Sequence, residues 1–423
     1  MVYVISQIGI PLMPCSNVIA RLLLKQGKAK VKRKTPFTIK LLYQTTNHTQ
    51  DLTLGIDTGS KYIGSAVVNE ENEVFYLSEI EIRNDISDKM KRRSRYRRNR
   101  RNRKTRYRKA RWLNRRNSIK NDRFSPTMTS KINSHLKEIN FVKSILPIKN
   151  VIIETATFDT HALKNPNIKN YQYQKGTNYG FANAKAYVLN RDNYICQYCK
   201  GKNKDSKLEV HHIIFRSNGG SDEAENLITL CKTHHDELHK GNITLKGGKR
   251  KSQLKHATQM NSIRKQLLIK LRCQETFGYI TKEHRYLMEL PKEHYNDAVA
   301  IACLNNILNT GIINVDFKTK SILLKKCIPY RDIQKTKGVR SQQKIPTGKI
   351  IGFRKFDKVK YLGNEYFIKG RISTGYGLLM DINGNKINFN DVPKGMKTAK
   401  LKSMKRIGAR KAWIMIENFT VSS

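Results

Sequence analysis

The stretch that decides the fold is Leu52-Thr-Leu-Gly-Ile-Asp57, which is followed by the turn Thr58-Gly59-Ser60. Its apolar residues predict a short strand that ends in a carboxylate. Two further strands are predicted at 62–68 and 74–80, so the three segments form a meander with Asp57 near the tip of the first strand. A single acid in this position is more often a cap or a solvated residue than a catalytic one.

Two other acids have a similar setting. Glu154 ends the apolar strand predicted at 151–154, and Asp297 begins an apolar helix predicted at 297–308. Three carboxylates that converge in space are able to hold two divalent ions, which clamp the attacking and leaving oxygens of a phosphodiester. His294 lies three residues before Asp297 and shares its helical face, so it is a candidate for handling the proton.

A cluster of cysteines and histidines fills residues 192–245. Cys196 and Cys199 form one pair with a two-residue spacer, and Cys231 and His234 form another. Two such pairs are typical of a structural zinc site with four tetrahedral ligands. The neighbouring His235 is an alternative fourth ligand, and the choice between the two histidines stays open.

Four histidines surround these pairs. His235 and His239 are four residues apart and share one helical face, and His211 is able to supply a third ligand to the same ion. His212 is then free to act as the general base that activates water. The alternative is a structural zinc domain that binds DNA without cutting it.

Residues 89–116 are strongly basic: 17 of these 28 residues are Lys or Arg and none is acidic. Like charges four residues apart destabilise an isolated helix, so we expect a helix that orders fully when phosphates surround it. A disordered basic arm is the alternative. The arginines expected to contact nucleic acid are Arg92, Arg93, Arg95, Arg97, Arg98, Arg100, Arg101, Arg103, Arg106, Arg108 and Arg111.

The composition supports a nucleic-acid partner. The chain has 423 residues and a formal net charge of +49, which is far more than solubility requires. No apolar run is long enough to span a membrane, and no basic segment precedes the first apolar stretch, so we expect a cytoplasmic protein. The odd number of cysteines fits reduced thiols and a metal site rather than a disulfide framework.

Residues 190–243 resemble the HNH, or ββα-metal, nucleases. The matching residues are His212 as the first histidine, Asn226 as the residue that braces the loop, and the pair His235 and His239 on the helix. The resemblance assigns His211, His235 and His239 to the metal and His212 to water activation. The chain departs from many of these relatives at His234, where they carry a cysteine.

The order of the motifs resembles the IscB family of transposon-encoded RNA-guided nucleases, which are related to the type II CRISPR effectors. The matching blocks are Gly55 to Ser60, the arginine-rich segment, Ile153-Glu154 and His294 to Ala298, with Pro11-Leu12-Met13-Pro14 near the amino terminus. The resemblance covers most of the chain and is weakest after about residue 335.

The resemblance implies an α+β multidomain fold: an RNase H-like (RuvC) α/β core, split by an arginine-rich helix and by an inserted zinc-containing HNH domain. The implied segments are an amino-terminal basic module (1–48), RuvC part I (49–88), the bridge helix (89–117), RuvC part II (118–172), the HNH domain (173–250), RuvC part III (251–334) and a carboxy-terminal β-rich domain that reads a short DNA motif (335–423).

The implied function is RNA-guided cleavage of double-stranded DNA by a monomeric protein bound to a noncoding guide RNA. The HNH site cuts the guide-paired strand and the RuvC site cuts the displaced strand, with Mg²⁺ or Mn²⁺ at both sites and structural Zn²⁺ in the HNH domain. Two alternatives stay open from the sequence. One is an unguided homing-type or junction-cutting nuclease, and the other is a catalytically inert RNA-binding protein.

Overall fold

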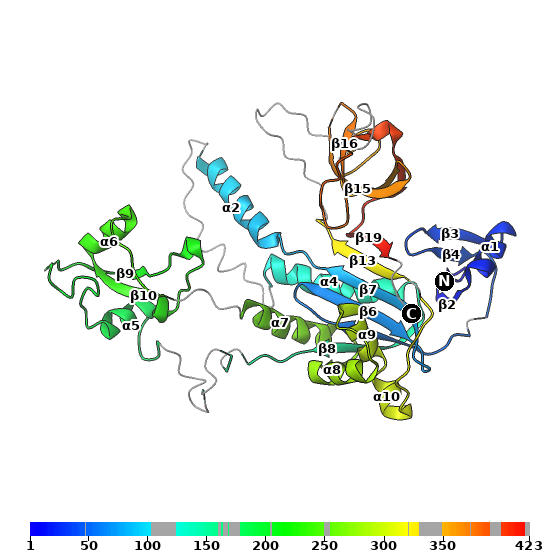
Figure 1. Cartoon of the computed structure of the whole chain (residues 1–423), viewed down its shortest axis with the longest axis horizontal. Coiled ribbons are helices and arrows are strands. Elements are labelled where there is room, and N and C mark those ends of the chain that lie inside the picture. Colours follow the sequence, from blue (N-terminus) through cyan, green and yellow to red (C-terminus); the bar gives the residue numbers. More distant parts are fainter. Residues whose placement is uncertain are drawn as a thin grey trace. The chain divides into compact units, whose positions relative to one another are not determined.

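The computed structural model describes the whole chain except residues 47, 103–123, 160–161, 164–167, 169–177, 204, 249–253, 320, 330–348, 373, 390–398 and 419–423. The chain divides into two compact units (Figure 1). One unit comprises Met1–Ala156 and Ser262–Ser423, and the other comprises Thr157–Asn261. The fold is therefore mixed α+β and multidomain, as predicted.

The first unit is built on a sheet of eight strands. Their order is β11-β8-β5-β6-β7-β13-β19, with β12 beside β7. The strands are β5 (Leu52–Asp57), β6 (Tyr62–Val68), β7 (Glu73–Glu81), β8 (Ile148–Thr155), β11 (Gln274–Phe277), β12 (Asp316–Phe317), β13 (Ile322–Cys327) and β19 (Trp413–Asn418). The predicted antiparallel meander is confirmed as β5, β6 and β7, and β8 pairs with β5 in parallel.

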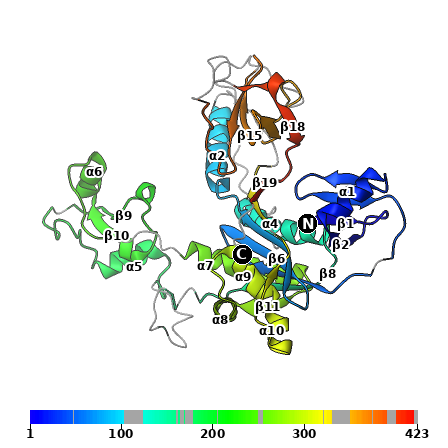
Figure 2. The same cartoon turned by 45° about the vertical axis from the view of Figure 1, so that its right-hand side comes forward.

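Two helices cover opposite faces of this sheet. On β6, the hydroxyl of Ser65 donates a hydrogen bond to the carboxylate of Glu138 on α4 (Pro126–Lys143), whereas Ala66 packs in a core cluster with α9 (His294–Ala302). Successive residues of a strand point to opposite faces, so α4 and α9 lie on different sides. Figure 2 shows α9 against the strands that its residues contact.

Glycine allows α9 to approach the sheet closely. A Cβ at Gly55 would overlap the carbonyl oxygen of Ala298, and a Cβ at Gly64 would overlap that of His294. Any larger residue at these two strand positions would push the helix outward. The two glycines therefore determine how deeply the first turn of α9 sits over the end of β5.

The other face contains a buried ion pair. The ammonium of Lys325 lies 2.7 Å from each carboxylate oxygen of Glu138, and both side chains have 0% exposure. Tyr76 donates a hydrogen bond of 2.7 Å to the same carboxylate. Removing one partner of such a pair leaves an uncompensated charge, so this network fixes the register of α4 against the sheet.

Two small sheets flank the central one along the chain. The first has the order β2-β1-β4-β3, and its strands are β1 (Val2–Ile5), β2 (Pro11–Cys15), β3 (Ala29–Arg33) and β4 (Thr38–Leu41). The helix α1 (Asn17–Lys25) connects β2 to β3. The second has the order β17-β16-β15-β14-β18 and contains β14 (Lys358–Tyr361), β15 (Asn364–Arg371), β16 (Tyr376–Met380), β17 (Ala399–Lys400) and β18 (Lys405–Gly408).

Three expectations from the sequence differ from the structure. The last strand, β19, pairs antiparallel with β13 in the central sheet rather than joining the carboxy-terminal β strands. The sequence also predicts a strand at 276–281, but β11 (Gln274–Phe277) ends at Phe277 and α8 (Gly278–Leu287) follows at once. The single helix expected at 297–308 is divided into α9 and α10 (Leu304–Thr310).

The arginine-rich segment begins as a helix. α2 (Ile86–Asn102) contains the basic run from Lys89 onward. Arg103, Arg106, Arg108 and Arg111 lie outside the described residues. In the described part of the chain, no helix combines the length and the apolar character that crossing a bilayer requires.

The second unit contains a ββα arrangement. Its elements are α5 (Ala184–Arg191), β9 (Leu208–His212), β10 (Leu227–Cys231) and α6 (Lys232–Lys240), followed by the first residues of α7 (Lys255–Lys270). β9 and β10 form an antiparallel pair in which His211 is opposite Ile228 and His212 is opposite Leu227. Both histidines therefore lie at the end of β9, where α6 packs on the strands.

Candidate functional site

The first candidate site lies at the carboxyl ends of β5 and β8. Asp57 and Glu154 are register partners on these parallel strands, and Asp57 is 8% exposed. The first turn of α9 brings His294 to them, because its Nδ1 lies 2.6 Å from Oδ2 of Asp57. The ring of His294 also stacks on Tyr62, with 5.4 Å between the centroids.

The pKa shifts at this site show that the acids repel one another electrostatically. Burial, and then the charge of Asp57, raises the pKa of Glu154 to about 7. Burial and the same charge also raise the pKa of Asp297. The hydrogen bond that His294 donates to Asp57 raises the pKa of His294, which therefore favours its protonated form beside the acids. A site that repels its own negative charges in this way favours a bound cation.

Arg285 is part of this site, although the sequence analysis did not select it. Its Nε lies 2.8 Å from Oδ1 of Asp297, and its side chain is 8% exposed. The residue comes from α8, which is a separate element from α9. Nothing in its spacing from Asp297 predicts the contact, because the contact depends on how the two helices pack.

The second unit contains two tight groups of metal-ligating side chains. Cys196, Cys199, Cys231 and His234 form one group, and His211, His235 and His239 form the other; within each group all ligand atoms lie within 4.8 Å of one another. Among the described residues, the carboxylates of the first site do not form a group this tight. Ligand oxygens that surround two ions lie farther apart than ligand atoms that surround one ion. The wider spacing of these carboxylates is therefore compatible with a two-ion site.

The Cys3His group fits zinc. Three thiolates and one imidazole are the donors of a tetrahedral structural site. Cys196 is 2% exposed and Cys231 is also 2% exposed, so the group is shielded from water. The sequence left His234 and His235 as alternatives, and the structure brings His234 to the cysteines, with its Nδ1 3.0 Å from Sγ of Cys231.

The group of three histidines presents imidazole nitrogens to one point. Nε2 of His211 lies 3.2 Å from Nε2 of His239. Nδ1 of His211 lies 2.7 Å from the backbone oxygen of His212, and a hydrogen bond donated to this oxygen leaves Nε2 unprotonated and free to bind a metal. Burial lowers the pKa of His211, which also favours the neutral form that a ligand needs.

His212 lies beside this group and is held by a carboxylate. Its Nε2 is 2.9 Å from Oδ1 of Asp222, and Nε of Arg216 is 2.6 Å from the same oxygen. The hydrogen bonds from His212 and Arg216 lower the pKa of Asp222, so the carboxylate is ionised at neutral pH. Asp222 and Arg216 were missed in the sequence, where they appear as ordinary polar residues of a glycine-containing loop.

Asn226 supports the loop that carries Asp222. Its amide donates hydrogen bonds of 3.0 Å to the oxygen of Ile214 and 2.8 Å to that of Ser221, and its oxygen accepts one of 3.0 Å from the nitrogen of Ile214. The side chain has 0% exposure. These bonds satisfy backbone groups at both ends of the loop.

Two protein families match this chain, one in each of the two regions that hold the candidate sites. Residues 2–176 match the family described as RRXRR protein, and residues 196–241 match the family described as HNH endonuclease. The chain therefore contains an RRXRR segment and an HNH endonuclease domain. The resemblance drawn from the sequence motifs is thereby confirmed, and the HNH segment contains both metal-ligating groups of the second unit.

The curated relatives match only part of this chain. It is 42% identical over 62 residues to the type IV methyl-directed restriction enzyme EcoKMcrA of Escherichia coli K12, which covers 13% of this chain and 22% of the relative. It is 37% identical over 67 residues to Anaredoxin of Nostoc sp. strain PCC 7120, which covers 16% of this chain and 86% of the relative.

A solved structure of Streptococcus thermophilus Cas9 in complex with the AGAA PAM is also similar. The identity is 13%, the TM-score is 0.32, and the match covers 58% of this chain and 32% of the Cas9 chain. The chain therefore covers only 22% of the length of the restriction enzyme and 32% of the length of the Cas9 chain.

Proposed function

We propose that this chain is an RNA-guided endonuclease that cuts both strands of DNA by hydrolysing phosphodiesters. The observation that carries the proposal is the presence, in two separate units of one chain, of two different sets of metal-ligating side chains. With one such site for each strand, a single protein is able to cleave both. The long basic helix α2 supplies the electrostatic surface that a polyanionic guide needs.

In the HNH domain, we assign the guide-paired strand to His212. Its Nε2 is engaged by Asp222, so Nδ1 is the nitrogen that takes a proton from the attacking water. The carboxylate holds the ring in one tautomer and stabilises the imidazolium that forms, as a triad aspartate does. Bound between His211, His235 and His239, a divalent ion would stabilise the negative charge on the phosphate and on the leaving oxygen.

In the first unit, we assign the displaced strand to the acids at the ends of β5 and β8. Asp57, Glu154 and Asp297 would hold a pair of Mg²⁺ or Mn²⁺ ions, whose oxygen preference fits a carboxylate set. His294 keeps Nδ1 on Asp57, so its Nε2 is available to handle the proton of the attacking water. On this proposal the eight-stranded sheet with α4 and α9 is a RuvC-like core, divided along the chain as the sequence analysis expects.

The remaining assignments follow from the IscB-like family. Zn²⁺ in the Cys3His group stabilises the HNH fold, the arginines of the bridge helix bind the guide RNA, and the carboxy-terminal β strands read a short motif beside the DNA target. The protein acts as a monomer within a ribonucleoprotein in the cytoplasm. Base pairing, rather than protein contacts, supplies sequence specificity.

Purification tests whether an RNA guides the reaction. The protein should copurify with a defined RNA, and RNase treatment should abolish cutting of a duplex that contains the matching sequence. Adding back the RNA with a changed guide segment should redirect the cut. Cutting at a fixed sequence by RNA-free protein would instead assign this chain to the unguided nucleases.

A further inference from the structure

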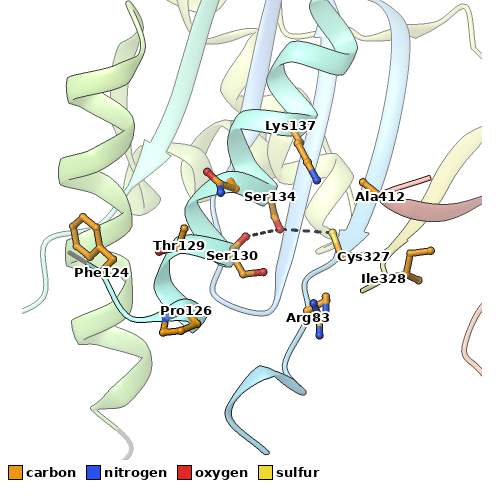
Figure 3. Close-up of a pocket in the computed structure, with 11 residues that line it drawn as sticks. Arg83, Phe124, Pro126, Thr129, Ser130, Ser134, Lys137, Cys327, Ile328 and Ala412 are labelled. Carbon is orange, nitrogen blue, oxygen red and sulfur yellow. Dashed lines mark hydrogen bonds between the residues drawn. The ribbon is translucent and has the colours of Figure 1, made fainter. Parts of the chain in front are cut away.

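A cavity of about 430 Å³ lies between α4 and the residues that follow β7 and β13, and Figure 3 shows its lining. This volume lies within the range of small-molecule sites. The lining residues include Arg83, Phe124, Lys137, Cys327, Ile328 and Ala412. None of the residues that line it is acidic. The cavity is separate from the acids at the ends of β5 and β8.

One wall is a polar stripe on α4. Thr129, Asn133 and Lys137 are four residues apart, so they project from one helical face into the cavity. Within the described part of the chain, the side chains of these three residues form no hydrogen bond or ion pair. Ser134, by contrast, donates its hydroxyl to the oxygen of Ser130 at 2.9 Å. The stripe therefore offers a hydroxyl, an amide and an ammonium to a ligand.

The opposite walls are apolar or aromatic. Phe124 closes one side, and Ile328 and Ala412 close another (Figure 3). The thiol of Cys327 lies 3.7 Å from the hydroxyl of Ser134, and burial raises the pKa of this thiol, so it remains neutral. A flat apolar ligand group fits between such walls, and an aromatic ring is the side chain on which nucleic-acid bases stack.

Cations stand at two edges of the cavity. Lys137 is exposed. Arg83 is paired with Asp85, with Nε 2.9 Å and Nη2 2.9 Å from Oδ1, which leaves its Nη1 donors for another partner. Two cations beside an apolar slot suit a nucleotide, because the phosphate faces the charges while the base enters the slot.

The position of the cavity in the chain indicates which nucleic acid supplies the nucleotide. Arg83 lies three residues before α2 begins, and Phe124 lies two residues before α4 begins. The cavity therefore lies where the arginine-rich segment leaves the central sheet and where the chain returns to it. An RNA strand held by that segment would pass this point.

We propose that this cavity binds one unpaired nucleotide of the RNA, with its base against Phe124 and its phosphate at Lys137. This inference rests on the proposed function, because it assumes that the arginine-rich segment binds RNA. The base would be taken out of a single-stranded or bulged part of the RNA, which costs less than opening a duplex.

Photocrosslinking of the full-length protein tests this site. The probe is a short single-stranded RNA with 5-iodouridine in place of uridine, and the matching DNA carries 5-iododeoxyuridine. Mass spectrometry should find the RNA crosslinked to the segment 124–137. The variant Thr129→Trp, which fills the cavity, should reduce this crosslink by about tenfold or more. The control Asn140→Trp, which is exposed on the same helix outside the cavity, should leave it unchanged.

A second measurement does not depend on filling the cavity. Lys137→Ala should lower the slope of log affinity against log salt by about 0.7, because one phosphate contact to a single strand is lost. Lys143→Ala removes the same charge from the last turn of α4, outside the cavity, and should not change the slope.

The outcomes separate this inference from the proposed function. RNA binding without a crosslink at 124–137, or a crosslink that survives Thr129→Trp, would overturn the nucleotide site while leaving RNA guidance intact. An equal or larger crosslink with the DNA probe would also overturn it, since the site would then belong to DNA. Failure of the wild-type protein to bind RNA would overturn both proposals.

Discussion

Asp57 and Glu154 face each other as direct register partners on β5 and β8, although 96 residues separate them in the chain. Parallel pairing places both strand ends at one edge of the sheet, so the two carboxylates crowd together. The raised pKa of Glu154, about 7, follows from its burial and from this neighbour. The site is therefore destabilised when no cation is bound.

This crowding predicts how stability depends on pH. Because the pKa of Glu154 is raised on folding, the folded state binds an extra proton between about pH 4.5 and pH 7, and the metal-free protein loses stability as the pH rises through this window. Glu154→Gln should stabilise the metal-free protein at pH 8 by about 1–3 kcal/mol and have little effect at pH 4. Denaturant unfolding in a chelator measures the difference.

Metal binding supplies the control for this prediction. Mg²⁺ should stabilise the wild-type protein at pH 8 and stabilise Glu154→Gln much less. Glu283→Gln, an exposed residue of α8, should behave as the wild type does. Equal stability of wild type and Glu154→Gln at pH 8 would show that the two carboxylates do not repel each other.

The two sites should differ in their metal preference. Three imidazoles suit transition ions better than Mg²⁺, whereas carboxylates suit Mg²⁺ and Mn²⁺. In metal-stripped protein reloaded with zinc, we expect Mg²⁺ to support cutting at the carboxylate site. Mn²⁺ or Ni²⁺ should support cutting at the histidine site at concentrations about tenfold lower than Mg²⁺. Titrations on a duplex labelled separately on each strand test this, and identical curves for the two strands would contradict it.

Asp222 should act through His212. Asp222→Asn removes the negative charge of the group that accepts the His212 hydrogen bond, and it should lower kcat for the guide-paired strand by about 10- to 100-fold, with little change in KM. Asp222→Glu should restore part of the activity. Arg216→Ala removes only the other partner of Asp222 and should leave kcat within about threefold. A rise in KM alone after Asp222→Asn would indicate a role in DNA binding instead.

The arginine-rich helix should account for much of the salt dependence of RNA binding. Replacing Arg92, Arg93, Arg95 and Arg97 with alanine should weaken binding and reduce the salt slope by about 0.7–0.9 for each lost phosphate contact. Replacing the same four residues with lysine keeps the charge and should preserve the slope. Filter binding over a range of salt concentrations measures both variants, and equal slopes for all proteins would refute the role of the helix.

The local elements of both sites are predictable from the sequence. Apolar residues before Asp57 and Glu154 predict strands that end in acids; β5 ends at Asp57, and β8 ends at Thr155, one residue after Glu154. The spacing of His235 and His239 places them on one face of α6, and the preceding His234 points toward Cys231 instead. The short spacings therefore carry most of the information about the histidine and cysteine groups.

Contacts between distant segments are not encoded in such spacings. Arg285 reaches Asp297 only because α8 packs beside α9, and β19 joins β13 only through long-range pairing. The short β11 ends at Phe277 because a helix begins at Gly278, where the backbone passes close to Glu154. These features depend on tertiary packing, which a single sequence does not reveal.

Strand-resolved cleavage by two single variants tests the central claim, that this chain contains two independent nuclease sites. The substrate is a duplex matched to the guide and labelled separately on each strand. His212→Ala should abolish the cut in the guide-paired strand and retain the other, and Asp57→Ala should abolish only the cut in the displaced strand. If either substitution abolishes both cuts in a protein that still folds and binds RNA, the two clusters are not independent sites and the account is wrong.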